Sequence, residues 1–202
     1  LPMAKHWWLP LAILCAGAVA VWPLREHLTA AEIAARSPRE TWLAALFLLA
    51  LYTLKGLSVA FPLSVLEAAG GLLFPFPLAL AVNLAGVMAA QTAPYLLGRR
   101  RQESSLPEHW PRLSGSRPGR TVFLLRLAGV APGDLVSIYL GAAGVPWGAY
   151  LTGGVLGSFP RVLAATLLGA ALWEFGSPRF FLSLLPGAAL TLLSLVLWRA
   201  WR

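Results

Sequence analysis

The longest apolar stretch of the chain, residues 41–97, limits what this sequence can fold into. It is almost continuously apolar, and as one helix it would measure about 85 Å, nearly three times the hydrocarbon thickness of a bilayer. The chain must therefore turn within it. A second apolar stretch, residues 121–172, would measure about 78 Å as a helix, so it must turn as well.

The composition places these stretches in a membrane. Hydrophobic residues make up 58% of the 202 residues and charged residues 12%, with a mean hydropathy of +0.70, which is not the composition of a soluble domain. The net charge of +8 arises from basic residues between the apolar stretches, as in cytoplasmic loops. We therefore expect no nucleic-acid partner. The single cysteine, Cys15, excludes an intramolecular disulfide and a cysteine metal cluster, and no cofactor is expected.

Three segments follow from the positions of the apolar stretches. Residues 1–40 are predicted to hold a transmembrane helix followed by a polar amphipathic segment. Residues 41–172 are predicted to form the membrane core, and residues 173–202 a C-terminal transmembrane helix. We therefore predict an all-α integral membrane protein.

The polar loop at residues 98–120 predicts the topology. It carries six arginines against two glutamates, which is the strongest positive-inside signal in the chain and indicates a cytoplasmic loop. The same rule assigns Lys5, Lys55 and Arg179 to the opposite side of the membrane, and the N-terminus would then face outward.

Prolines and glycines fall at matching places in the two apolar stretches. Pro62 is followed nine residues later by Gly71, and Pro132 is followed nine residues later by Gly141. Since such residues weaken or end helices, we predict that each set shapes a re-entrant hairpin. The residues expected to shape the hairpins are Pro62, Gly70, Gly71, Pro132, Gly133, Gly141 and Gly144.

The two hairpins are predicted at about residues 58–76 and 121–146, with spanning helices at residues 41–57 and 78–97 around the first. A single crossing between the hairpins would place them on opposite faces of the membrane, as an inverted repeat. The alternative is a chance match, because prolines and glycines are frequent in membrane helices.

Four ionisable residues stand out inside these apolar segments: Glu67, Arg126, Asp134 and Arg161. A charge at membrane depth costs several kcal/mol unless it is paired or hydrated. Two acids and two bases in opposed hairpins would neutralise one another and line a hydrated cavity. Two structural alternatives stay open: Arg126 would reach the headgroups with its long side chain, and Asp134 would cap a helix.

Several of these motifs together resemble a known family. They are Phe61-Pro62-Leu-Ser64 leading to Gly70-Gly71-Leu-Leu-Phe74, then Leu97-Gly98-Arg99, then Leu125-Arg126-Leu leading to Pro132, and finally Gly141 to Gly144. Over residues 41–172 the chain resembles the VTT domain of the DedA superfamily, also called the SNARE-associated Golgi protein family. It is most similar to the Tvp38-like branch.

The resemblance implies a fold, a function and site residues. It implies two re-entrant hairpins packed against spanning helices, and a role in moving lipids between leaflets. Bacterial members are linked to recycling undecaprenyl phosphate or flipping phospholipids, with coupling to protons, and eukaryotic relatives are described as scramblases. Arg99 and Arg126 match basic residues of the family. Glu67 and Asp134 fall in hairpins where relatives carry essential acids, in a different register.

The function expected from these residues is lipid translocation in a bacterial inner membrane. The guanidinium of Arg126 suits phosphate oxygens, and Glu67 would couple headgroup passage to protons by alternating between its neutral and charged forms. The alternatives are a secondary transporter of a small ion or solute and a non-transporting scaffold. An enzyme is not expected, because the sequence has no nucleophile–base pair or metal spacing. The oligomeric state is not predicted.

Overall fold

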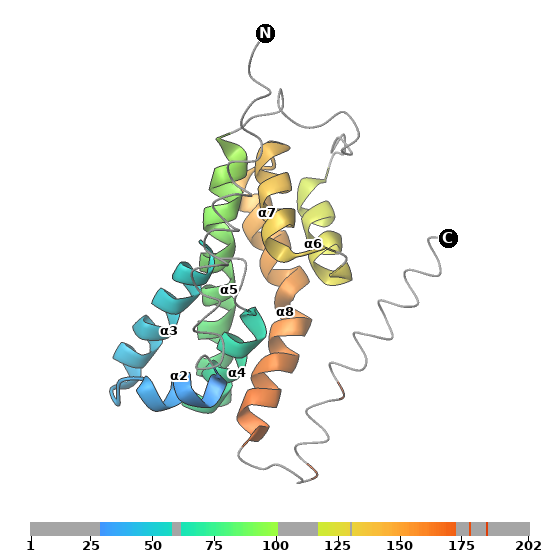
Figure 1. Ribbon diagram of the computed structural model, residues 1–202. Helices are drawn as coiled ribbons and strands as arrows, with labels where there is room; N and C mark the ends of the chain where they lie inside the picture. The colour runs from blue at the N-terminus through green and yellow to red at the C-terminus, as the bar shows by residue number, and fades with distance from the viewer. Residues whose placement is uncertain are drawn as a thin grey trace.

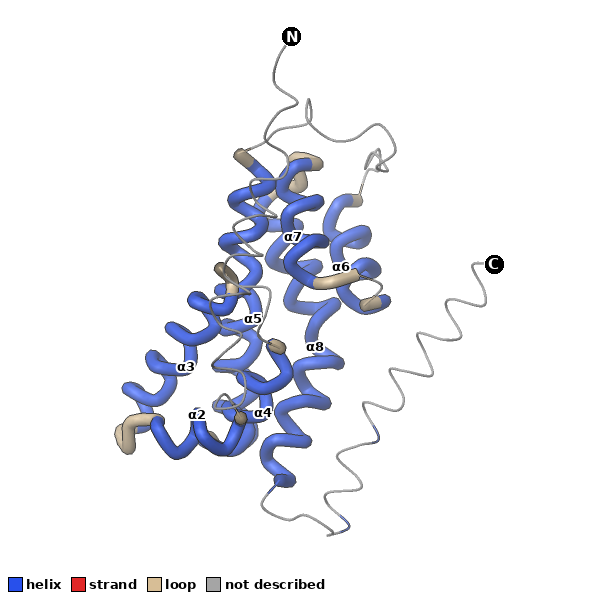
Figure 2. The backbone as a smooth tube through the Cα atoms, in the orientation of Figure 1, coloured by secondary structure: helices blue, strands red, loops and turns tan. Residues whose placement is uncertain are grey.

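The computed structural model describes residues 29–57, 62–100, 117–129 and 131–172, together with positions 178 and 185. All regular structure within these ranges is helical (Figure 2), as predicted. The helices are α2 (Ala30–Arg36), α3 (Thr41–Lys55), α4 (Leu63–Leu73), α5 (Phe76–Arg99), α6 (Pro118–Ala128), α7 (Gly133–Ala142) and α8 (Trp147–Ala171). The predicted transmembrane helices near the two termini lie outside the described residues.

The long helices α5 and α8 form the centre of the fold (Figure 1). With 24 and 25 residues they are long and apolar enough to cross a membrane, and each would measure about 36 Å. They run antiparallel (Figure 1), since the ring of Tyr95 near the end of α5 packs against that of Tyr150 near the start of α8, with ring centroids 4.3 Å apart. The apolar helix predicted at residues 78–97 is thus part of α5.

Two helical hairpins precede the long helices and lie toward opposite ends of the bundle (Figure 1). Helices α3 and α4 form the first and lead into α5, while α6 and α7 form the second and lead into α8. The turn of the first hairpin reaches the middle of α5, where Gly56 packs against the backbone of Ala90. The turn of the second reaches the middle of α8, where Gly157 packs against Phe123 and Arg126.

The extent of the first hairpin differs from the prediction. Residues 41–57 were expected to span the membrane, but α3 has 15 residues, about 22 Å, which is shorter than a hydrocarbon core. Residues 58–76 were expected to hold the whole hairpin, whereas they contain a single complete helix, α4. The first arm of the hairpin is therefore α3. The C-terminal end of α3 contacts the middle of α5, and α4 runs from that point back toward the start of α5.

Prolines begin the helices of this fold. Pro62, Pro75, Pro132 and Pro146 occupy the N-cap positions of α4, α5, α7 and α8. Proline suits a helix start, where its missing N–H removes no helical hydrogen bond. Gly144 has a φ of 71° in the turn between α7 and α8, a conformation that favours glycine.

Three other glycines that were predicted to break helices lie inside them. Gly70 and Gly71 are in α4, and Gly141 is in α7. Their role is close packing: a Cβ at Gly71 would overlap the carbonyl oxygen of Thr166 in α8, and a Cβ at Gly141 would overlap that of Tyr95 in α5. Small residues allow membrane helices to approach this closely.

These two crossings are equivalent. Gly71 and Gly141 lie at the same position counted from the first residue of α4 and of α7, and Thr166 and Tyr95 at the same position in α8 and α5. The second arm of each hairpin therefore packs against the long helix that follows the other hairpin, through matching residues.

We expect Gly71→Ala and Gly141→Ala each to lower the free energy of unfolding by about 2 kcal/mol, because the added Cβ would force two helix backbones apart. Gly148→Ala is the matched control: Gly148 is exposed near the start of α8 and a Cβ there meets nothing within 4 Å. It should leave stability unchanged or raise it slightly. Chemical denaturation in detergent micelles measures these differences, and equal stabilities for all three variants would contradict the packing role.

Candidate functional site

Polar and charged side chains form three groups inside this helical fold. Residues at most 8% exposed include Lys55, Glu67, Asn83, Gln91, Arg126, Asp134, Ser137, Ser158 and Thr166. Such burial requires hydrogen-bond or ion-pair partners, because an unpaired polar group in the interior is costly. The partners show what the charges do.

The first group surrounds Glu67 in α4. Arg161 of α8 donates from Nη1 to Glu67 Oε1 at 2.6 Å; the Glu67 side chain is fully buried, while that of Arg161 is 44% exposed. Asn83 of α5 donates to the backbone oxygen of Glu67 and to Thr166 Oγ1, both at 2.8 Å. Tyr52 of α3 donates to Asn83 Oδ1 at 3.0 Å. This group ties the first hairpin to both long helices.

The second group joins the turns of the two hairpins. Lys55, at the end of α3, donates from Nζ to Asp134 Oδ2 at 2.7 Å, and both side chains are at least nine-tenths buried. The alternative role for Asp134 as a helix cap is wrong, because Pro132 is the N-cap of α7 and Asp134 lies in the first turn. The positive-inside rule had placed Lys55 on the outer side of the membrane, so this ion pair was not predicted from the sequence.

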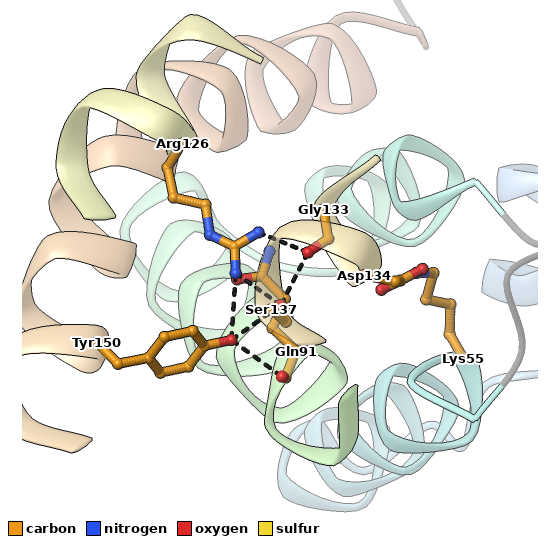
Figure 3. Close-up of polar contacts among 7 residues, drawn as sticks. All are labelled: Lys55, Gln91, Arg126, Gly133, Asp134, Ser137 and Tyr150. Carbon is orange, nitrogen blue, oxygen red and sulfur yellow. Dashed lines mark hydrogen bonds and ion pairs between the residues drawn. The ribbon is translucent and has the colours of Figure 1, made fainter. Parts of the chain in front are cut away.

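The third group surrounds Arg126 at the end of α6 (Figure 3). Its guanidinium donates to the backbone oxygen of Gly133 at 2.8 Å, to Ser137 Oγ at 2.7 Å and to Tyr150 Oη at 3.1 Å. Arg126 is 8% exposed, so the alternative in which it reaches the headgroups is wrong. Gly129, which has a φ of 59°, ends α6 and turns the chain. Helix α7 then begins next to the guanidinium of Arg126.

The neutral partners of Arg126 are also bonded to one another. Ser137 donates from Oγ to the backbone oxygen of Gly133 at 2.8 Å, and Tyr150 donates from Oη to the backbone oxygen of Gln91 at 2.9 Å. The first bond lies within α7 and the second joins α8 to α5. Tyr150 Oη also lies 3.0 Å from Ser137 Oγ, which links α8 to α7. These contacts fix the oxygens that orient the guanidinium of Arg126.

The charges balance in two of the groups but not in the third. Glu67 pairs with Arg161 and Asp134 with Lys55, so the expected mutual neutralisation of two acids and two bases is wrong in detail, since a third base takes part. Arg126 forms no ion pair with any carboxylate of the described residues, and its buried Nε has no hydrogen-bond partner among them. Among the described residues, the site therefore holds one buried positive charge that is not paired with a carboxylate.

Arg99 lies apart from these three groups. It is exposed at the end of α5, where its guanidinium donates to Tyr95 Oη at 2.8 Å. Tyr95 in turn donates to the backbone oxygen of Val145 at 2.7 Å, and its ring lies between Arg99 and Tyr150. Of the five site residues predicted from the sequence, Arg99 is thus the one placed outside the buried network.

Sequence reasoning missed Lys55, Asn83, Gln91 and Tyr150. A signal was present for two of them, because Asn83 and Gln91 are uncharged polar residues within the apolar stretch that became α5. They were not predicted as site residues because only formally charged residues were considered. Among the described residues, no three histidine, cysteine, aspartate or glutamate side chains lie close enough together to hold a metal ion.

Comparison with known proteins identifies the family. The VTT domain profile matches residues 61–171, from just before α4 to the end of α8, and includes Glu67, Arg126 and Asp134. No curated protein and no solved structure matches the chain. The Tvp38-like branch stays a prediction. Because the match covers more than half of the chain, this polypeptide belongs to the VTT domain family, that of the DedA and SNARE-associated Golgi proteins.

Proposed function

We propose that the protein moves lipids with a phosphate headgroup between the leaflets of a bacterial inner membrane. The observation that carries this proposal is Arg126, a buried guanidinium without a carboxylate partner among the described residues. A lone charge at membrane depth costs several kcal/mol. An anionic headgroup at Arg126 would offset that cost, and the planar fork of arginine suits the oxygens of a phosphate.

The start of α7 adds to this attraction. Arg126 binds the backbone oxygen of Gly133, the first residue of α7, so the guanidinium lies beside a helix N-terminus. The first backbone N–H groups of a helix have no partner within the helix and carry partial positive charge, which favours bound phosphate. Two sources of positive potential thus lie together.

The packing of the hairpins supports a path across the membrane. We propose that α3–α4 and α6–α7 are re-entrant hairpins entering from opposite leaflets, as an inverted repeat. The equivalent crossings at Gly71 and Gly141 support this reading, because matching residues make them. The ion pair between Lys55 and Asp134 would then lie where the two hairpins meet, near the middle of the bilayer.

Proton coupling is the second part of the proposal. Glu67 is fully buried, and its Oε2 has no hydrogen-bond partner among the described residues, so this oxygen can take up a proton without losing a protein contact. A pH gradient across the membrane would then drive net movement of phosphate lipid toward one leaflet. Equal rates with and without the gradient would contradict this part.

The test is lipid movement in proteoliposomes of the purified full-length chain. A fluorophore on the acyl chain reports, by quenching from outside, how fast phosphatidic acid, phosphatidylglycerol and a neutral glycosyl lipid cross the bilayer. We expect the two phosphate lipids to cross at least tenfold faster than the glycosyl lipid, because Arg126 attracts anions. Equal rates would contradict the proposal. Flux of a soluble solute without lipid movement would indicate a secondary transporter, and absence of both fluxes a scaffold.

A further inference from the structure

We infer that the side chain of Gln91 is a second ligand for the lipid phosphate, beside Arg126. This inference deepens the proposed function and rests on it. Gln91 lies in α5, about two helical turns before the end of that helix, and only its backbone oxygen takes part in the network around Arg126.

One side-chain atom of Gln91 is buried without a partner. Gln91 is 2% exposed, and its Oε1 is fully enclosed and forms no hydrogen bond with any described residue. Most buried side-chain polar groups in folded proteins have a partner, and leaving one unpaired is unfavourable. An apolar residue would fill the same place without this penalty, so the amide indicates a ligand. Because Oε1 is an acceptor, the ligand must also carry a donor, such as the P–OH of a phosphate monoester or a hydroxyl of the glycerol headgroup of phosphatidylglycerol.

The amide of Gln91 and the guanidinium of Arg126 face the same point. A Cβ built on Gly133 would lie 3.2 Å from Arg126 Nη1 and 3.7 Å from Gln91 Nε2; apart from the two neighbouring residues and the nearby backbone of α7, no other heavy atom of the described residues lies within 4 Å of it. In Figure 3 the Gln91 side chain extends toward the guanidinium beside the start of α7. Because residue 133 is glycine, it places no side chain of its own at the point that both groups face.

The chemistry of the two groups is complementary for a phosphate. Arg126 supplies positive charge, and its Nη1 faces the point beside Gly133, while Gln91 supplies a neutral N–H donor that neither repels nor neutralises the arginine. Phosphate oxygens accept from both groups. This chemistry is shared by phosphate monoesters and diesters, so phosphatidic acid and phosphatidylglycerol are tested as separate arms.

Gln91→Leu is the decisive variant, because binding and stability should respond differently. The affinity for short-chain phosphatidic acid or phosphatidylglycerol, measured in detergent by titration, should fall about tenfold through loss of one hydrogen bond to a charged group. The unfolding temperature without lipid should not fall, since an unpaired buried amide is removed. Thr152→Val is the control: Thr152 is exposed on α8 and bonds only to its own helix. Wild-type affinity in Gln91→Leu for both lipids would overturn the inference.

Gly133→Ala tests the same point without touching Gln91. The added methyl group would occupy the space that both groups face, so the affinity should again fall about tenfold, and unchanged affinity would overturn the inference. Arg126→Met distinguishes the role of Gln91 from the proposed function on which it rests. If only Arg126→Met weakens binding, the role of Gln91 is wrong and the proposed function stands. If Arg126→Met binds both lipids like the wild type, the proposed function itself is wrong.

Discussion

Arg126→Met is expected to reduce the rate of phosphate-lipid movement in proteoliposomes by a factor of about a hundred or more. Methionine keeps an unbranched side chain of similar length but removes the charge and the donors. Charge-assisted hydrogen bonds contribute about 1.5–3 kcal/mol each, and a phosphate bound to the guanidinium would lose at least two of them, so the loss corresponds to a hundredfold or more.

The stability of Arg126→Met should stay near that of the wild type. Ser137 still donates to the oxygen of Gly133, and Tyr150 still donates to the oxygen of Gln91, so the neutral groups keep partners. Replacing a buried charge with an apolar side chain is often neutral or stabilising. A large drop in the free energy of unfolding, with normal lipid movement per folded molecule, would show that Arg126 is structural.

Arg120→Met is the matched control for this experiment. Arg120 lies on the same helix, α6, and is exposed, so the control makes the same chemical change six residues away. Its rate of lipid movement should be within about twofold of the wild type, because exposed charges are screened by water and salt. A loss of rate in both variants would point to the net charge of α6 and against a specific role for Arg126.

Arg161→Met is expected to destabilise the protein by about 3–5 kcal/mol, the usual effect of removing one partner of a buried ion pair. The reason is that Glu67 is fully buried and Arg161 is its ion-pair partner. Glu67→Gln should cost much less, because the Arg161 side chain is 44% exposed and can be hydrated when its partner is neutral. Chemical denaturation in detergent micelles measures both free energies.

The double variant Glu67→Gln, Arg161→Met tests this reason. With no charge left in the fully buried position, it should recover at least half of the stability lost in Arg161→Met, which gives a coupling energy of about 2 kcal/mol. Additive losses in the double variant would show that the effect of Arg161→Met comes from lost packing in α8. The two single variants thus distinguish charge from volume at one site.

Several local features of this protein could be predicted from its amino-acid sequence alone. The apolar segment at residues 78–97 indicated a long helix, which is part of α5, and Pro62 and Pro132 lie at helix starts because proline suits that position and disrupts a helix interior. Spacing within each stretch also indicated the equivalence of Gly71 and Gly141. The unusual cost of charge in an apolar segment singled out Glu67 as a residue that needs a partner.

Which polar groups meet depends on contacts between helices that lie far apart in the sequence. Lys55 and Asp134 are 79 residues apart in the chain, and Glu67 and Arg161 are 94 apart, so no local pattern specifies either pair. Contact between hairpins and long helices, made at glycines that let backbones approach, brought these side chains together. Among the described residues it also left Arg126 without a carboxylate partner and Oε1 of Gln91 without a hydrogen bond, because pairing depends on distances in space that the order of residues does not state.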